Sequence, residues 1–188
     1  MFRNKRIILA SQSPRRAQLL REAGFTFEVR NAENDETYHG NLPAASVAKF
    51  LAEQKARQFQ SLQDNEIIIT ADTIVVVNDI ILGKPADRNG AMDMLSSLSG
   101  KMHSVITGVC LKTSGEIISF DDLTKVYFKK LTDQEIEYYV DHFKPYDKAG
   151  AYGIQEWIGM IGITRIEGSY FNVMGLPVHK LYEAILSF

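Results

Sequence analysis

Residues 6–24 read RIILASQSPRRAQLLREAG, and this stretch decides the class of fold. The apolar run at 6–10 predicts a short buried strand. A helix is expected to follow almost at once, because Ser13 is a preferred N-cap residue, Pro14 suits the first helical position and Gly24 can end the helix. A buried strand that leads directly into a helix is typical of α/β proteins.

Strand and helix patterns alternate along the rest of the chain. Short turns at Asn78-Asp79 and Ser114-Gly115 predict β-hairpins, and Thr132 with Glu135 has the pattern of a capping box. Alternation together with hairpins favours an α/β fold with a mixed sheet. Further strands are expected at 25–30, 66–70, 74–77 (a separate strand or a continuation), 80–82, 102–112, 116–129, 163–167 and 169–174, and further helices at 43–59, 88–98, 132–142 and from Pro177.

The composition is that of an ordinary folded chain. It has 188 residues, of which 45% are hydrophobic and 23% charged, and no repeat or linker divides it. We therefore expect one domain over residues 1–188. The net charge of −2 gives no overall positive field, so stable nucleic-acid binding is not expected.

The number of cysteines and the hydropathy of the sequence indicate where in the cell the protein is expected. The single cysteine, Cys110, excludes an intramolecular disulfide and falls in an apolar pattern typical of a core position. No stretch approaches the roughly 18 apolar residues that span a bilayer, and the N-terminal apolar run is too short for the core of a signal peptide. These features favour a cytoplasmic protein with no membrane partner.

The first chemical signal is the start of the N-terminal helix. Ser11 and Ser13 carry hydroxyls, while Arg15 and Arg16 fall in the first helical turn, where the helix dipole disfavours cations. Free backbone N–H groups, hydroxyls and forked guanidinium groups together suit a phosphate. The alternative is an ordinary capped helix with solvated arginines.

The second signal is a lysine on an apolar helical face. At about 100° per residue, the apolar side chains of residues 47–59 form one arc, and Lys55 falls near its middle. A lysine is rarely buried without a partner, so we expect an inward ammonium group that meets a carboxylate or a phosphate. The alternative is a side chain that reaches water at the edge of the arc. On this pattern, Lys55→Met is expected to leave folding largely intact.

The third signal is an acidic residue between two aliphatic runs. Asp72 and Thr73 interrupt the pattern of residues 66–77, and a carboxylate there is costly unless it has a partner. Such a carboxylate can hold a divalent metal or activate water. The alternative is a turn aspartate that bonds to the backbone.

Two glycine-containing segments carry further cations. Lys84 lies in Gly-Lys-Pro, where glycine permits close approach of a ligand and lysine offers a compact charge for phosphate. Residues 147–155 read DKAGAYGIQ, in which Lys148 suits phosphate and Gln155 can read the edge of a base. The alternatives are a plain turn and a flexible loop.

Taken together, these segments resemble the Maf family of nucleotide pyrophosphatases, which are relatives in fold of the inosine triphosphate pyrophosphatases. The likeness runs from Ile7 to the last helix. It implies a long, mixed and curved β-sheet flanked by helices, with two lobes around a cleft. The motifs that carry it are S-x-S-P-R-R at 11–16, AEQKA at 52–56, ADT at 71–73, GKP at 83–85, DKAGAYGIQ at 147–155, and GSY at 168–170 followed by GLP at 175–177.

The resemblance also implies roles for single residues. It makes Asp72 the proton acceptor, places Glu36 at an acidic position near the metal and the phosphates, and makes Lys55 and Lys84 phosphate ligands. A Mg²⁺ or Mn²⁺ ion, helped by Glu36 and Asp72, would neutralise the triphosphate. Asp72 would orient or deprotonate a water molecule that attacks the α-phosphorus, releasing pyrophosphate and a nucleoside monophosphate.

Base choice is the finest expectation. Arg16, Thr73 and Gln155 match positions that the family associates with dTTP and UTP rather than with a 7-methylguanine nucleotide. After Gln155 the family pattern has glycine, whereas this chain has Glu156.

Two alternatives to this reaction stay open: a nucleotide-binding regulator of septum formation without turnover, and a pyrophosphatase for modified purine nucleotides. The carboxylates favour an enzyme over a pure binder, because they repel phosphate unless a metal intervenes. A homodimer is also left open.

Overall fold

The N-terminal segment forms β1 (Arg6–Leu9) and α1 (Pro14–Glu22), as predicted. Ser13 is the N-cap residue and Pro14 begins the helix, but the Ser13 side chain makes no capping hydrogen bond. Gly24 follows the helix with a φ of 84°, a left-handed conformation that glycine adopts without strain. Both ends of α1 therefore lie where the local signals place them.

The computed structural model describes residues 5–32 and 42–188. Helices and strands alternate along it, and short helical turns connect several of them. The elements after α1 are β2 (Phe27–Val29), α2 (Ala44–Arg57), β3 (Glu66–Val77), β4 (Ile80–Leu82), α3 (Arg88–Leu98), β5 (Met102–Lys112), β6 (Ile117–Phe128), α4 (Asp133–Phe143), η1 (Ala149–Ala151), α5 (Trp157–Gly162), β7 (Ile163–Glu167), α6 (Tyr170–Met174) and α7 (Val178–Leu186).

The strands form one mixed sheet in the order β2-β1-β3-β5-β6-β7, with β4 paired to β3. β1 is parallel to β2 and to β3, whereas β4 is antiparallel to β3 and β7 is antiparallel to β6. The predicted α/β class with a mixed sheet is confirmed. The two stretches predicted around Asp72 are one continuous strand, β3. Asn78 and Asp79 both have positive φ, the geometry of the tight turn predicted between β3 and β4.

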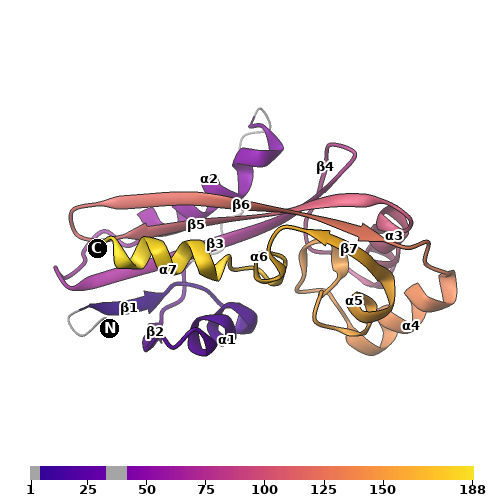
Figure 1. Cartoon of the computed structure of the whole chain (residues 1–188), viewed down its shortest axis with the longest axis horizontal. Helices are drawn as coiled ribbons and strands as arrows, with labels where there is room; N and C mark the ends of the chain where they lie inside the picture. The colour runs from indigo at the N-terminus through magenta and orange to yellow at the C-terminus, as the bar shows by residue number, and fades with distance from the viewer. Residues whose placement is uncertain (1–4, 33–41) are drawn as a thin grey trace. The chain divides into compact units, whose positions relative to one another are not determined.

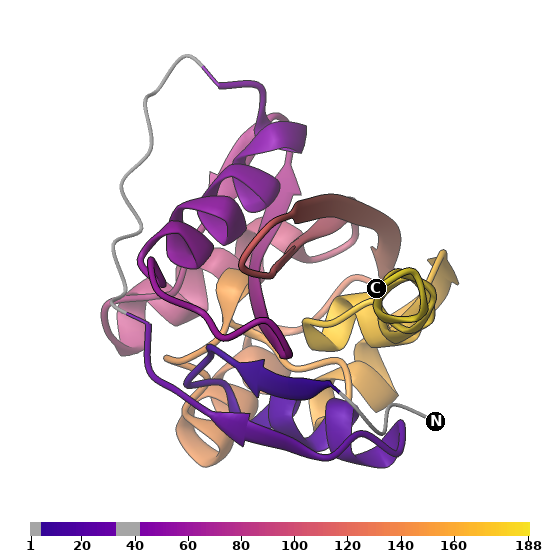
Figure 2. The ribbon, with the colours of Figure 1, turned by 90° about the vertical axis from the view of Figure 1, so that its left-hand side faces the viewer.

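The chain divides into two compact units. Unit 1 consists of Met1–Asp72, Thr107–Asp122 and Gly175–Phe188, and unit 2 consists of Thr73–Ile106 and Leu123–Met174. In unit 1, α1 and α2 lie on opposite sides of β1 (Figure 2). In unit 2, α4 packs against both α3 and α5, and α5 leads directly into β7 (Figure 1).

The core of unit 1 follows from its aliphatic strands. Ile8 and Leu9 of β1 and the isoleucines of β3 at 67–69 are fully buried. Cys110 of β5 is also fully buried and packs with Ala52 and Ala56 of α2, so the predicted core position of the cysteine is confirmed.

One element prediction is wrong. Residues 169–174 were expected to form a strand, but α6 occupies Tyr170–Met174. Gly168 breaks the strand pattern after β7 with a φ of 125°, and the Ser169 hydroxyl accepts a hydrogen bond from the Asn172 backbone N–H at 3.3 Å, as an N-cap residue does. The buried Asn172 amide then donates to Val105 O at 3.1 Å and to Thr124 Oγ1 at 2.9 Å. The segment 169–174 is therefore held by side-chain hydrogen bonds of Asn172 and not by the backbone hydrogen bonds of a strand.

None of the helices within residues 5–32 and 42–188 has the length and apolar character needed to cross a bilayer.

Candidate active site

A buried ion pair between α2 and β3 is the main polar feature of the core of unit 1. Lys55 is 5% exposed and Asp72 is 8% exposed, and the Lys55 Nζ atom donates a hydrogen bond to Asp72 Oδ1. The lysine therefore points inward from the apolar face of α2, as predicted, and its partner is a carboxylate. Lys55 does not reach water at the edge of the helix.

Two close contacts hold α2 against the sheet next to this pair. The Thr70 hydroxyl of β3 donates a hydrogen bond to Ala52 O at 2.6 Å, which ties the strand to α2 one turn before Lys55. A Cβ atom added at Gly108 of β5 would lie 2.3 Å from the Ala48 carbonyl carbon and from the Lys49 nitrogen. Only a glycine permits such an approach of backbone to backbone, and that approach fixes the depth of the helix that carries Lys55.

The serine–arginine motif is tied to a distant part of the chain within unit 1. The Arg16 Nε–H group donates to Gly175 O at 2.8 Å, and its Nη1 atom donates to Ser11 Oγ at 3.3 Å. The Ser13 backbone N–H also donates to Ser11 Oγ, at 3.2 Å. The segments 11–16 and 175–177, which stand far apart in the sequence, therefore meet through Arg16. Arg15 is half-buried in the first turn of α1.

The parallel pairing of β1 with β3 brings this motif toward Asp72. Leu9 pairs with Ile69, and the Ala10 N–H donates to Ile69 O at 2.8 Å, so β1 ends while β3 continues to Asp72. Ligands of α/β proteins commonly bind beyond the carboxyl ends of parallel strands. The start of α1 follows that end of β1, and Asp72 lies on the strand beside it.

In unit 2 the structure brings together the two glycine-containing segments. The Gly150 N–H donates to Gly83 O at 3.0 Å, and a Cβ atom at Gly150 would lie 3.0 Å from a methyl group of Val75. The loop at 147–155 therefore rests on β3 and on the segment that carries Lys84. The Lys84 side chain is exposed, and Thr73 is half-buried on β3 directly after Asp72.

Lys148 is held by carboxylates. Its side chain is 9% exposed, and its Nζ atom lies 2.7 Å from Asp147 Oδ1 and 3.1 Å from Glu156 Oε1. The second oxygen of Glu156 accepts a hydrogen bond from the Tyr139 hydroxyl. The sequence marks Glu156 as a departure from the family pattern but does not indicate its contacts. Tyr139 carries no signal of this kind, because a tyrosine in an apolar helical pattern is typical of an ordinary core residue.

Gln155 precedes Glu156 in the same loop and has one buried polar atom without a partner among the described residues. Its Oε1 atom is buried and accepts no hydrogen bond within the part of the chain that the structure describes. A buried acceptor without a donor is costly, so this atom suits a ligand that supplies an N–H group.

Glu36 lies outside the described residues, so its predicted role is not addressed by the structure. Within residues 5–32 and 42–188, no group of three or more His, Cys, Asp or Glu side chains is placed to hold a metal ion. Mg²⁺ usually binds through one or two carboxylates together with substrate phosphates. The predicted metal ligands, Asp72 and Glu36, therefore stay a prediction.

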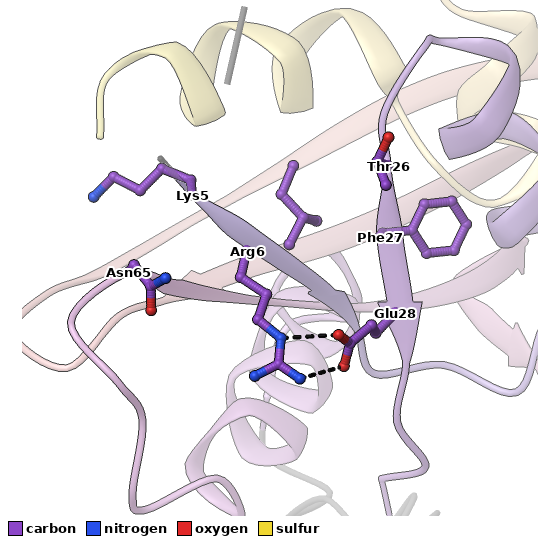
Figure 3. Close-up of a pocket in the computed structure, with 7 residues that line it drawn as sticks. Lys5, Arg6, Thr26, Phe27, Glu28 and Asn65 are labelled. Carbon is purple, nitrogen blue, oxygen red and sulfur yellow. Dashed lines mark hydrogen bonds and ion pairs between the residues drawn. The ribbon is translucent and has the colours of Figure 1, made fainter. Parts of the chain in front are cut away.

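A separate pocket of about 600 Å³ lies at the β1–β2 edge of unit 1. Figure 3 shows Arg6 donating two hydrogen bonds to Glu28 in its wall, at 2.9 and 2.8 Å. Arg6 also contacts the buried Glu66, which accepts a further hydrogen bond from Arg30. The arginines of this region are thus engaged by carboxylates, and the pocket is lined by Lys5, Arg6, Ile7, Thr26, Phe27, Glu28 and Asn65, which include none of the predicted site residues.

The fold is that of a known class of protein. The structure of a HAM1 protein from Coxiella burnetii superposes with a TM-score of 0.53, covering 98% of this chain and 100% of that one at 15% identity. At that identity the likeness concerns the fold alone. A protein-family model described as "Maf-like protein" matches residues 6–188, and the chain belongs to this family.

Relatives named "dTTP/UTP pyrophosphatase" are similar over nearly their whole length. The protein of Phocaeicola vulgatus is 51% identical over 182 residues, which cover 96% of this chain and 94% of the relative. The protein of Flavobacterium johnsoniae is 50% identical over 179 residues, covering 95% and 92%. The protein of Porphyromonas gingivalis strain W83 is 48% identical over 187 residues, covering 97% and 94%.

Proposed function

We propose that this protein hydrolyses dTTP and UTP to the nucleoside monophosphate and pyrophosphate. The observation that carries the proposal is the buried Lys55–Asp72 pair, in a chain that is about half identical along its length to proteins named for that activity. A buried carboxylate on a strand, oriented by a cation, is suited to bind and activate a water molecule. We further propose that the reaction takes place in the cytoplasm and that residues 1–188 act as one functional domain.

Asp72 is the base in this scheme. Lys55 holds Oδ1, so Oδ2 is the oxygen that we assign to the attacking water. The water oxygen forms a bond to the α-phosphorus, its proton moves to Asp72, and the bond from the α-phosphorus to the bridging oxygen of the β-phosphate breaks. Pyrophosphate leaves with the electron pair of that bond.

The cations and the start of α1 hold the triphosphate. We assign Arg15, Arg16 and Lys84 to phosphate, with the hydroxyls of Ser11 and Ser13 as further donors. Lys55 and Lys148 stay in the substrate-binding set as predictions. A divalent metal, Mg²⁺ or Mn²⁺, would be held by Asp72 and Glu36 and would supply positive charge to the phosphates in the transition state.

Gln155 supports a preference for uracil and thymine. These bases present an N3–H donor between two acceptors, and the unpaired Oε1 atom of Gln155 requires a donor. Cytosine has an acceptor at N3, which would leave the Gln155 oxygen unpaired. Discrimination of this type is strong, because the mismatched complex buries polar groups without partners. Arg16 and Thr73 are assigned to the same choice by resemblance.

The experiment that tests the reaction is hydrolysis of UTP in ¹⁸O-labelled water with a divalent metal present. Attack at the α-phosphorus places the label in UMP and leaves the released pyrophosphate unlabelled. Label in pyrophosphate, or products UDP and phosphate, would contradict the scheme. The absence of any turnover would favour the nucleotide-binding regulator, and size-exclusion chromatography of the same preparation tests the homodimer.

A further inference from the structure

We propose that Glu156 is a positioning residue for base recognition, acting with Tyr139 to fix the turn that presents Gln155. The inference rests on the proposed function and assigns to its site a residue that makes no contact with the reacting atoms. It concerns the turn Gly153–Glu156, which precedes α5 in unit 2.

The turn is held at both ends by one hydroxyl. Tyr139 is fully buried in α4, and its Oη atom accepts a hydrogen bond from the Gly153 N–H at 3.0 Å while donating its own proton to Glu156 Oε2. The backbone closes the same turn, because the Glu156 N–H donates to Gly153 O at 3.0 Å. Gln155 therefore stands in a turn whose two ends are joined through the backbone and again through Tyr139.

The Glu156 side chain turns away from the helix that it precedes. Glu156 is the N-cap residue of α5, yet its carboxylate makes no capping hydrogen bond to that helix. It folds back instead over Gly153, where a Cβ atom would lie only 2.8 Å from Glu156 Cδ. A glycine at this position is what lets the carboxylate reach the Tyr139 hydroxyl.

The charges around the carboxylate favour the arrangement. Burial and the carboxylate of Glu156 together raise the pKa of Tyr139 above its ordinary value, so the hydroxyl keeps the proton that it donates. The Lys148 Nζ atom lies 3.1 Å from Glu156 Oε1 and 2.7 Å from Asp147 Oδ1. Lys148 thus links the first residues of the 147–155 loop to the residue that follows Gln155.

The contacts of Tyr139 and Glu156 bear on base recognition, because no hydrogen bond from the described residues to the Gln155 oxygen orients that side chain. The Oε1 atom finds no donor in the part of the chain that the structure describes, so no hydrogen bond to this oxygen fixes the amide, and the backbone of the turn determines where the side chain starts. If the Gly153–Glu156 turn relaxes, Oε1 can turn away from the base, and the donor of uracil loses its advantage over the acceptor of cytosine.

The test compares kcat/KM for UTP and CTP in the wild type, Glu156→Ala, Glu156→Gln and Tyr139→Phe. We expect the UTP-to-CTP ratio to fall by about tenfold in Glu156→Ala and Tyr139→Phe. Glu156→Gln should recover part of the ratio, because its amide oxygen still accepts from Tyr139. Tyr138→Phe is the matched control, since the Tyr138 side chain is 45% exposed on the same helix, and it should keep the wild-type ratio.

A purely structural role predicts a different result. Loss of folded protein lowers kcat for both nucleotides equally and leaves the ratio unchanged, and an unchanged ratio in folded Glu156→Ala and Tyr139→Phe would overturn the proposal. If Glu156→Ala does not fold, Tyr139→Phe and Glu156→Gln decide. Wild-type protein that fails to hydrolyse UTP would instead overturn the proposed function.

A double-mutant cycle identifies the residue through which Glu156 acts. Gln155→Ala should lower the UTP-to-CTP ratio strongly in the wild-type background and much less in the Glu156→Ala background. Equal effects in the two backgrounds would show that Glu156 and Gln155 act independently, and the positioning role would be wrong.

Discussion

The ammonium group of Lys55 and the carboxylate of Asp72 form an ion pair in which only 7% and 11% of the two side chains are exposed. The pair joins α2 to β3 within unit 1. Each charge depends on the other, because an isolated buried charge is far more costly than a paired one. This dependence shapes what substitutions at either position will do.

Asp72→Asn should abolish turnover and keep the fold, with a lower free energy of unfolding because Lys55 is left buried beside a neutral partner. The amide keeps the shape of the side chain, and its oxygen still accepts a hydrogen bond from Lys55, but it cannot take a proton from water. We expect kcat to fall at least about a hundredfold. Pyrophosphate release measures turnover, and the circular dichroism spectrum reports whether the fold is kept. A kcat near the wild-type value would show that Asp72 is not the base.

Lys55→Met removes the cation of the ion pair and leaves the carboxylate. The helical pattern alone predicts that methionine is tolerated, but the structure shows that the substitution leaves Asp72 buried without its cation. We therefore expect loss of activity together with a loss of about 3 kcal/mol in the free energy of unfolding. Urea titration measures the stability.

The double variant Lys55→Met/Asp72→Asn is the control for Lys55→Met. It removes both charges and should recover much of the lost stability without recovering activity. A stable single variant with full activity would show that the pair has no role in either property.

Gly108→Ala should weaken the packing of α2 on β5 and lower the stability of the protein. The added methyl group would overlap the backbone of Ala48 and Lys49, at 2.3 Å, and neither backbone group can move without displacing the helix. Overpacking of this kind costs about 1–3 kcal/mol. Activity should fall as well, because α2 carries Lys55.

Gly115→Ala is the matched control, because a methyl group added there meets nothing within 4 Å. Thermal unfolding of the two variants gives the comparison. Equal midpoints would contradict the close approach of α2 to β5.

His103 should make stability depend on pH. Its ring is buried beside Tyr152, with Nε2 2.7 Å from the hydroxyl, and burial lowers its pKa to about 4. The unfolded chain, with a pKa near 6.5, then binds more protons between pH 4 and 6.5. The contribution of His103 is therefore complete above pH 6.5 and lost as the pH falls, by about 3 kcal/mol over the window. Urea titrations of wild type and His103→Gln across this range should show a steeper decline in the wild type; parallel curves would exclude His103 as the cause.

Much of the architecture was predictable because its signals are local. Asp87 accepts a hydrogen bond from the Gly90 N–H at the start of α3, and Thr132 with Glu135 forms the predicted capping box of α4. The helix at 170–174 has local signals in Gly168 and Ser169, but its position also depends on the anchoring of Asn172 on residues distant in the sequence. Local patterns cannot report such contacts.

The candidate site was predictable only in part, for the same physical reason. The apolar arc of α2 indicated that Lys55 needs a partner, but only the packing of α2 on β3 identifies that partner as Asp72. The link from Arg16 to Gly175 and the hydrogen bond from Tyr139 to Glu156 likewise join residues that carry no mutual signal in the sequence.

The most direct test of the account is a comparison of kcat/KM for dTTP, UTP, dCTP, ATP, GTP and 7-methyl-GTP under one metal condition. We expect dTTP and UTP to have the highest kcat/KM, because the unpaired Gln155 oxygen requires the N3–H donor of thymine and uracil. Tolerance of both sugars is expected, since nothing in the scheme reads the 2′-hydroxyl. If 7-methyl-GTP or another purine nucleotide has the highest kcat/KM, the pyrimidine preference and the role of Gln155 are contradicted. If no nucleotide yields pyrophosphate, the proposed pyrophosphatase activity is contradicted.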